Sequence, residues 1–501
     1  MVLDINLIRS PNTLETVRRS HTQRYGKSSD IDDLILHDNE FRSTTVTINN
    51  HSKLENTIKR ILGVRMKAKK KNHTLDSDNL VTQDTQDTKA TEILLSSSLM
   101  DSIPHIDQST LETLSTNNLI KLSQLCRVTK LNLVYTLQQH EKERDILLRK
   151  IGNILHESVP FGPDDDSNVV VLTHDVISIP IEPNLQPNLQ PNFPHYELVK
   201  MIDGVDTTAG SKIAGNRGYF LKGPLVYLSQ ALQQFALKIL DDADFVAVQT
   251  PYFMNHDVMS SVAQLSQFDE ELYKIVCSDD DDSNVDSKSE VKSKSSTKYL
   301  IATSEQPLTA LHAGEKMSHK KLPIKYAGIS TCFRKEAGRH GKDMSGIFRV
   351  HQFEKVEQFI ICSIDESWDH LDMMLKNSTT FLNLLDIPYR VVNIASGELN
   401  LAAAKKYDVE GWFPSSKTYR ELVSCSNCTD YHSRNLNIKY IPKGKNESDA
   451  IHVHMLNSTM CAITRMICVI LENYQTDRGI VVPEVLRSYM PKRYRELIPF
   501  I

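Results

Sequence analysis

The residues best suited to chemistry lie between Ser330 and Ile361, where cations, carboxylates and aromatic rings occur close together. The polar and apolar pattern predicts two strands, over 331–336 and 348–361, and a polar loop between them that contains three glycines. Charged groups on a strand face need partners if they are buried. The face is therefore either solvated or the floor of a ligand site.

Side chains alternate across a strand, so Arg334 and Glu336 would share a face of the first predicted strand. The second strand would carry four polar or aromatic side chains on one face, namely His351, Phe353, Lys355 and Glu357. A guanidinium, a flat ring and carboxylates on one floor suit a ligand that has an anion, a planar ring and an amine. A solvated hairpin face is the alternative.

The stretch FRKEAGRHGKDMSGIFRVHQFEKVEQF, which begins at Phe333, resembles the second signature motif of class II aminoacyl-tRNA synthetases, in the form found in seryl-tRNA synthetases. The resemblance extends from about Tyr196 to Ile501, and more loosely to the N-terminus. It implies an α+β fold, with an antiparallel sheet of six to eight strands flanked by helices in a catalytic domain over 196–501. It also implies that L-serine is activated with ATP and that the seryl group is transferred to the 3′ end of a serine tRNA.

The resemblance also implies a role for individual residues. Arg334 would contact the α-phosphate and the serine carboxylate, Arg465 would hold the γ-phosphate, and these two are the expected catalytic residues. Glu421 and Ser424 would hold a Mg²⁺ ion on the ATP phosphates. The serine-binding residues would be Thr303, Glu305, Arg334, Glu357 and Asn457. The ATP-binding residues would be Arg334, Lys335, Glu336, Val350, His351, Gln352, Phe353, Glu421, Leu422, Val423, Ser424 and Arg465.

Electrostatics leads to two expectations about these groups. Glu357 would be compensated only by the serine ammonium, the alternative being a glutamate paired with a structural Arg or Lys. Arg465 is the one charge in the apolar run from Met460 to Leu471, so it needs either an internal acid or a ligand anion. We expect Arg334 and Arg465 to be free of internal acids.

Three local patterns should position the site residues. A strand over 299–303 would place Thr303 and Glu305 on one face at its end. A second strand over 451–455 would precede a buried helix that is capped by Asn457 or Ser458 and reaches about Tyr474. A helix over 224–240 and a strand over 245–250 resemble the first class II motif, which implies a homodimer.

The N-terminal part has the pattern of two long helices. Residues 12–103 contain no proline, and heptad spacing predicts a helix that ends in a basic run at Lys71. A second helix is predicted from about Leu111 to Leu155, and a polar, loosely ordered connection covers 72–107. An antiparallel coiled-coil arm is one interpretation, and helices packed on the main body are the other. The resemblance favours an arm in a domain over 1–158 that grips tRNA.

A proline-repeat linker is predicted over 159–195, and a low-complexity insertion over 277–298. The chain of 501 residues has a formal net charge of −5, so contact with nucleic acid requires a local basic patch. The N-terminus lacks a signal pattern, and there is no apolar stretch of about 18 residues. We therefore expect a cytoplasmic protein with no membrane partner. The alternatives in function are a ligase that adenylates an amino acid for a carrier protein and a non-catalytic tRNA-binding paralogue.

Overall fold

The computed structural model describes residues 2–71, 106, 108–175, 192–264, 268, 271–276, 297–336 and 346–501. The chain divides into two compact units, which we call the arm unit (Lys27–Lys150) and the body unit (Met1–Gly26 with Ile151–Ile501). Two short helices of the body unit, α1 (Ile5–Arg9) and α2 (Pro11–Gln23), precede the arm unit in the sequence. The arm unit is therefore narrower than the predicted domain over 1–158, which as a functional division stays a prediction.

Side-chain contacts join the residues that precede the arm unit in the sequence to residues that follow it, and all of these residues belong to the body unit. The guanidinium of Arg24 donates to the backbone carbonyls of Asn153 and Asn400, at 3.0 Å in both cases. Asp4 lies 3.0 Å from Arg434. The first residues of the chain consequently belong to the body rather than to the helical arm.

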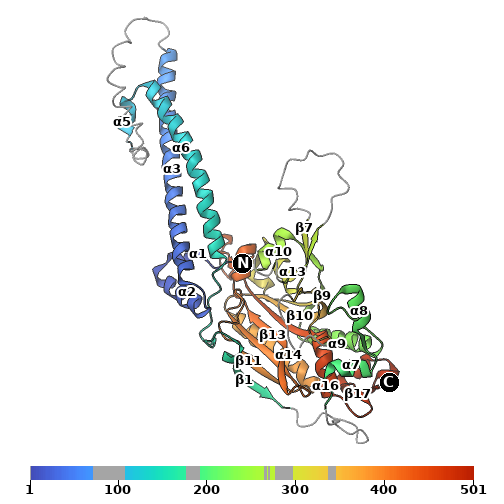
Figure 1. The fold of residues 1–501 in the computed structure, drawn as a ribbon. Coiled ribbons are helices and arrows are strands. Elements are labelled where there is room, and N and C mark those ends of the chain that lie inside the picture. Colours follow the sequence, from blue (N-terminus) through green and yellow to red (C-terminus); the bar gives the residue numbers. More distant parts are fainter. Residues whose placement is uncertain are drawn as a thin grey trace, which may run out of the picture. The chain divides into compact units, whose positions relative to one another are not determined.

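Two antiparallel helices, α3 (Ser28–Lys71) and α6 (Thr116–Leu148), make up most of the arm unit and run side by side (Figure 1). The direction follows from contacts between them, since Glu55 pairs with Lys130 and, further along α3, Arg65 donates to the carbonyl of Leu114. Their seam is apolar and buried, as expected for a coiled coil, and includes Leu54, Ile58, Leu119, Leu122 and Cys126.

The second arm helix is shorter than the sequence predicted. A separate short helix, α5 (Gln108–Thr113), precedes it, and the Ser115 hydroxyl accepts from the Asn118 N–H at 3.2 Å to cap the start of α6. The helix ends at Leu148, not at Leu155. Most of the predicted connection over 72–107 lies outside the described residues.

A sheet of eight strands is the centre of the body unit, and its helices confirm the predicted α+β fold (Figure 1). All neighbouring strands are antiparallel except β4, which is parallel to β9. The strands in spatial order are β1 (Val169–His174), β11 (Tyr389–Asn393), β12 (Lys405–Phe413), β13 (Thr418–Asn427), β16 (His454–Ala462), β10 (Gln352–Cys362), β9 (Ile324–Phe333) and β4 (Val246–Gln249).

The alternation of side chains on β10 separates the two faces of this sheet. Val356 and Ile360 enter a large apolar core with α7 (His195–Met201), α9 (Pro224–Asp241), α14 (Ser367–Leu384) and α16 (Ile463–Asn473). Phe359 and Ile361 face a smaller core with α10 (His256–Val262) and α13 (Glu305–Ala310). Glu357 is two residues from Phe359 and so belongs to this second face.

Short elements complete the body unit. They are β2 (Val205–Asp206), α8 (Thr207–Ala214), β3 (Phe220–Leu221), β5 (Phe253–Asn255), β6 (Lys274–Val276), β7 (Thr297–Leu300), β8 (Lys316–Ser318), α15 (Tyr431–Leu436), β14 (Lys439–Ile441), β15 (Ile451–His452), β17 (Gly479–Val481) and β18 (Leu497–Pro499). The described part of the chain contains no helix with the length and apolar character that a membrane span requires.

Several predicted boundaries were wrong. The predicted linker contains β1, because its run of valines pairs with β11 at the sheet edge; residues 176–191 lie outside the described part. The predicted insertion over 277–298 ends earlier, since Thr297 and Lys298 begin β7, and 277–296 lie outside the described residues. The first hairpin strand ends at Phe333 and the second begins at Gln352.

The C-terminal helix was also placed too early. Asn457 and Ser458 lie inside β16, between β13 and β10, and α16 begins at Ile463. A central strand is buried on both faces, so its pattern runs into that of a buried helix without a visible break. The predicted helix over 224–240 and the strand over 245–250 are confirmed as α9 and β4.

Candidate active site

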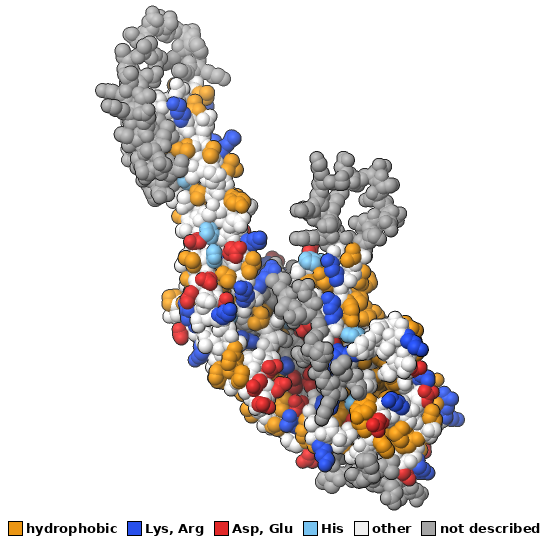
Figure 2. All heavy atoms as spheres, in the orientation of Figure 1, with side chains coloured by type: hydrophobic (Ala, Val, Ile, Leu, Met, Phe, Trp, Pro, Cys, Tyr) orange, Lys and Arg blue, Asp and Glu red, His pale blue; other side chains and the backbone are white. Residues whose placement is uncertain are grey.

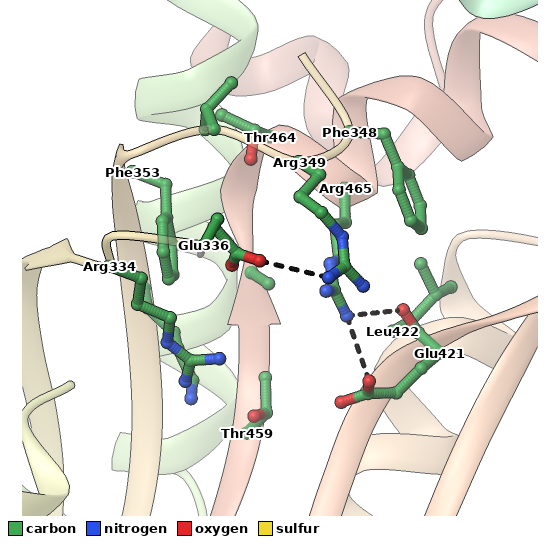
Figure 3. A pocket seen from close by; sticks show the side chains of 13 residues that line it. Arg334, Glu336, Phe348, Arg349, Phe353, Glu421, Leu422, Thr459, Thr464 and Arg465 are labelled. Carbon is green, nitrogen blue, oxygen red and sulfur yellow. Dashed lines mark hydrogen bonds and ion pairs between the residues drawn. The ribbon is translucent and has the colours of Figure 1, made fainter. Parts of the chain in front are cut away.

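A pocket, which we call the arginine pocket, opens on the body unit between the end of β9, the start of β10, β13 and the junction of β16 with α16 (Figure 3). It brings together groups from four separate parts of the sequence. Its lining residues are Arg334, Glu336, Phe348, Arg349, Val350, Phe353, Lys355, Glu421, Leu422, Thr459, Ala462, Thr464 and Arg465.

Arg334 follows the last residue of β9 and is held there by its backbone. Its N–H donates to the carbonyl of His351 at 2.9 Å, and the ring Nδ1 of His351 lies 2.9 Å from the Arg334 carbonyl. The guanidinium lies 5.7 Å from the centre of the Phe353 ring. Its Nε is buried and has no hydrogen-bond partner among the described residues, as expected for a cation that waits for a ligand.

Arg465, in the first turn of α16, is instead paired within the protein. Its Nη1 lies 3.2 Å from Glu421 Oε2 and donates to the Glu421 backbone carbonyl at 3.0 Å (Figure 3). The expectation that both arginines are free of internal acids was thus wrong for Arg465. Burial alone would raise the pKa of Glu421, but Arg465, Lys406 and Arg334 together lower it to about 2.

Glu336 also has a protein partner, since its Oε2 lies 3.0 Å from Arg349 Nη1 (Figure 3). It does not share a strand face with Arg334, because β9 has ended and Glu336 adopts a left-handed conformation with φ 50°. Both side chains nevertheless line the arginine pocket. Sequence reasoning missed Arg349, which lies before β10, where no strand period fixes its direction.

Glu357 is buried on β10 beside Lys355, whose Nζ lies 2.7 Å from Glu357 Oε1. The other carboxylate oxygen accepts from the Ser304 hydroxyl and, at 3.2 Å, from the Glu305 N–H. Burial would raise the pKa of Glu357, but Lys355, the Ser304 hydroxyl and Arg334 lower it below its ordinary value. The expectation that only a substrate ammonium compensates Glu357 was wrong, and the lysine-paired alternative is observed.

Thr303, Glu305 and Asn457 join the same network. Asn457 Nδ2 donates to Glu305 Oε1 at 2.9 Å, and the Glu305 N–H donates to Thr303 Oγ1 at 3.3 Å. Thr303 and Glu305 do not lie on a strand as predicted, because β7 ends at Leu300 and Glu305 begins α13. Burial, reinforced by the nearby Glu357, raises the pKa of Glu305 to about 7.

A β-bulge places Glu421 and Ser424 on one face of β13. Residues three apart on a regular strand point to opposite faces. On β13, however, Val423 pairs with Val409 and Glu421 with Glu410, so Leu422 is an extra residue that resets the alternation. A carboxylate and a hydroxyl on one face are oxygen donors of the kind that Mg²⁺ prefers.

Four of the predicted ATP-binding residues, besides Ser424, lie outside the lining of the arginine pocket. His351 and Gln352 line a different pocket, next to α9, and the Val423 side chain is buried in the large core. The Lys335 N–H donates to the carbonyl of Glu271. Conversely, sequence reasoning missed several lining residues, namely Phe348, Arg349, Thr459, Ala462 and Thr464.

Comparisons with known proteins bear on this arrangement. Residues 288–474 match the tRNA synthetase class II core domain (G, H, P, S and T), and residues 2–106 match the seryl-tRNA synthetase N-terminal domain. The chain is 43% identical to the cytoplasmic serine–tRNA ligases of Homo sapiens and Bos taurus, over 100% of this chain and 92% of each relative. The chain belongs to the seryl-tRNA synthetase family.

Two solved structures of seryl-tRNA synthetases extend the likeness to three dimensions. The cytoplasmic serine–tRNA ligase from Naegleria fowleri in complex with AMP is 40% identical, with a TM-score of 0.79, over 100% of this chain and 99% of that one. The seryl-tRNA synthetase from Pyrococcus horikoshii complexed with ATP is 31% identical, with a TM-score of 0.76, over the full length of both chains. The predicted family, fold and enzyme class are confirmed, and the relatives' names agree with the predicted cytoplasmic location.

Proposed function

We propose that the chain activates L-serine with ATP in the arginine pocket and then transfers the seryl group to the 3′ end of a serine tRNA. The observation that carries the proposal is the placement of Arg334. Its guanidinium has a buried, unpartnered Nε and lines one pocket with Phe353 and Arg465. A planar guanidinium can bridge two oxyanions, here the α-phosphate and the serine carboxylate.

The pocket suits each part of ATP. Phe353 offers a ring face for the adenine. Glu336 keeps one carboxylate oxygen that is not engaged by Arg349, and this oxygen can accept from the adenine amino group. Arg465 would hold the γ-phosphate once it exchanges Glu421 for that anion. Glu421 and Ser424 would then hold Mg²⁺, which would neutralise charge on the phosphates.

In the first step a carboxylate oxygen of serine attacks the α-phosphorus. The new O–P bond gives seryl-adenylate, and the bond from the α-phosphorus to the bridging oxygen breaks to release pyrophosphate. In the second step a ribose hydroxyl at the 3′ end of the tRNA attacks the seryl carbonyl, and AMP leaves. Both steps depend on positioning and charge stabilisation, so no protein nucleophile is needed.

Serine would be selected by the network around Glu357. Glu357 and Glu305 supply carboxylates for the ammonium and the hydroxyl, while Thr303 and Asn457 fix Glu305 through hydrogen bonds. Lys355 keeps Glu357 ionised before serine binds. Polar groups that pair with a substrate hydroxyl reject analogues that lack it, because those groups would be left buried without partners.

The arm unit would bind the tRNA, in keeping with the family match of residues 2–106. Lys67 belongs to a basic run at the end of α3, where its charge would attract phosphates. A homodimer would form through α9 and β4, which correspond to the first class II motif. A ligase for a carrier protein would have no use for such an arm, and a non-catalytic paralogue would not need Arg334.

Charging of tRNA with radiolabelled serine tests the proposal. The purified chain should charge serine tRNA with serine and, under the same conditions, give at least about 100-fold less product with alanine or cysteine, which lack the hydroxyl. Charging that is equal for serine and alanine, or that is absent while the helical signal of the chain is intact, would overturn it.

A further inference from the structure

Two histidines and a glutamate meet across the seam of the arm unit. His37 and Glu40 lie one turn apart on α3, and His140 lies on α6. The two Nδ1 atoms are 3.4 Å apart. Glu40 Oε2 lies 2.9 Å from His140 Nδ1 and 3.9 Å from His37 Nδ1. In the described part of the chain this is the one group of three such side chains whose ligand atoms converge.

The spacing of these three atoms matches the coordination shell of a small metal ion. Ligand atoms about 2.1 Å from a tetrahedral metal are separated from each other by about 3.4 Å. The observed separations of 2.9, 3.4 and 3.9 Å have this value as their mean. Shifts of a few tenths of an ångström, within the reach of rotations about side-chain bonds, would make them equal.

The surroundings leave room for an ion and its fourth ligand. The side chains of His37 and His140 are 27% and 22% exposed, and that of Glu40 is 44% exposed. Histidine side chains reach the surface of the arm unit in Figure 2. Water can therefore complete a tetrahedron. The positive charge of Arg144, one turn beyond His140, is engaged by Asp145 at 2.7 Å.

Proton positions also favour a cation. If His140 is the tautomer whose Nδ1–H donates to Glu40, the lone pair of His37 Nδ1 points toward the space between the three side chains. If both Nδ1 atoms carried protons, two N–H groups would face each other with one carboxylate between them. A metal ion replaces the proton and uses all three lone pairs.

We propose that His37, Glu40 and His140 form a binding site for a divalent transition metal of the zinc class, with water as the fourth ligand. Two imidazoles and one carboxylate favour zinc over magnesium, which prefers an all-oxygen shell. The ion would link α3 to α6 within the arm unit. Since it would bind only the folded arrangement, it would stabilise the pair of helices. This inference does not depend on the proposed function.

Cobalt(II) titration of the full-length chain tests the site, because the visible absorption of cobalt(II) reports four-coordinate binding. We expect one equivalent to give this absorption and added zinc to remove it. His37→Gln and His140→Gln should each weaken binding at least about tenfold. His256→Gln is the matched control. His256 also pairs with a carboxylate, that of Asp257 at 3.0 Å, but it does not belong to a group of three converging metal-ligand side chains among the described residues.

Circular dichroism checks that the variants are folded, since all of them should retain the helical signal of the wild type. A second readout is the unfolding temperature, which zinc should raise in the wild type and in His256→Gln but not in His140→Gln. The proposal would be overturned if cobalt gave no four-coordinate absorption. It would equally be overturned if the affinity of His37→Gln and His140→Gln matched that of His256→Gln.

Discussion

Arg465 Nη1 lies 3.2 Å from Glu421 Oε2, so two groups that we propose bind ATP and Mg²⁺ are paired with each other. The pair explains how Arg465 is tolerated at the start of an otherwise apolar helix. It also keeps Glu421 ionised, with a lowered pKa. Binding of ATP and Mg²⁺ would replace this single pair by two, arginine with phosphate and carboxylate with metal.

Glu421→Gln should weaken the use of Mg²⁺, because an amide lacks the charge of the carboxylate. We expect the Mg²⁺ concentration for half-maximal pyrophosphate exchange to rise at least about tenfold. Glu410→Gln is the matched control, because Glu410 lies opposite Glu421 in the register of the strands and pairs with Arg390. An equal rise for both variants would argue against Glu421 as a metal ligand.

Glu357→Gln should raise the KM for serine about 10-fold to 100-fold, the cost of losing one hydrogen bond to a charged group. The KM for ATP should change less than about threefold, because Glu357 lies outside the lining of the arginine pocket. Glu354→Gln serves as the control, since Glu354 lines a different pocket. Steady-state kinetics separates these outcomes, and a rise in the KM for ATP alone would contradict the role in serine binding.

Serine binding should strengthen as pH rises through about 7. Burial raises the pKa of Glu305 to about 7, so below this pH the carboxyl is protonated and cannot attract an ammonium. The KM for serine, measured from about pH 5.5 to about pH 7.5, should fall by up to about tenfold per pH unit on the acid side. In Glu305→Gln this dependence should disappear. A pH profile that is unchanged in this variant would assign the titration to another group.

Replacing Lys27–Lys150 by a short flexible linker should abolish most tRNA charging and leave serine-dependent pyrophosphate exchange within about threefold of the wild type. The first 26 residues must be kept, because Arg24 and Asp4 bond to the body unit. Parallel charging and exchange assays on one preparation would test this division. Equal loss of both activities would contradict it.

Local sequence patterns predicted the structure correctly where a single helix or strand determines it. The apolar stripe after Pro224 predicted α9, and the alternation on β10 placed Phe353 and Lys355 together in the lining of the arginine pocket. Heptad spacing predicted the helices α3 and α6, and the family resemblance favoured their pairing along one seam. The resemblance to family motifs then supplied the family and part of the lining of the arginine pocket, including Arg334, Phe353 and Arg465.

What failed depends on contacts between distant segments. The bulge at Leu422 appears only when β13 is aligned with β12, and the pairing of Arg465 with Glu421 joins positions 44 residues apart. The boundary between β16 and α16 was hidden because both elements are buried along almost their whole length. The meeting of His37 with His140 requires the register of two helices, which spacing in the sequence does not fix.

The most direct test of the central claim is serine-dependent ATP–pyrophosphate exchange by the wild-type chain, Arg334→Ala and Arg465→Ala. We predict exchange that requires serine in the wild type and a loss of at least about 100-fold in each variant, since each would remove a guanidinium that we propose contacts a phosphate. Exchange that does not depend on serine, or variants that match the wild type, would contradict the account.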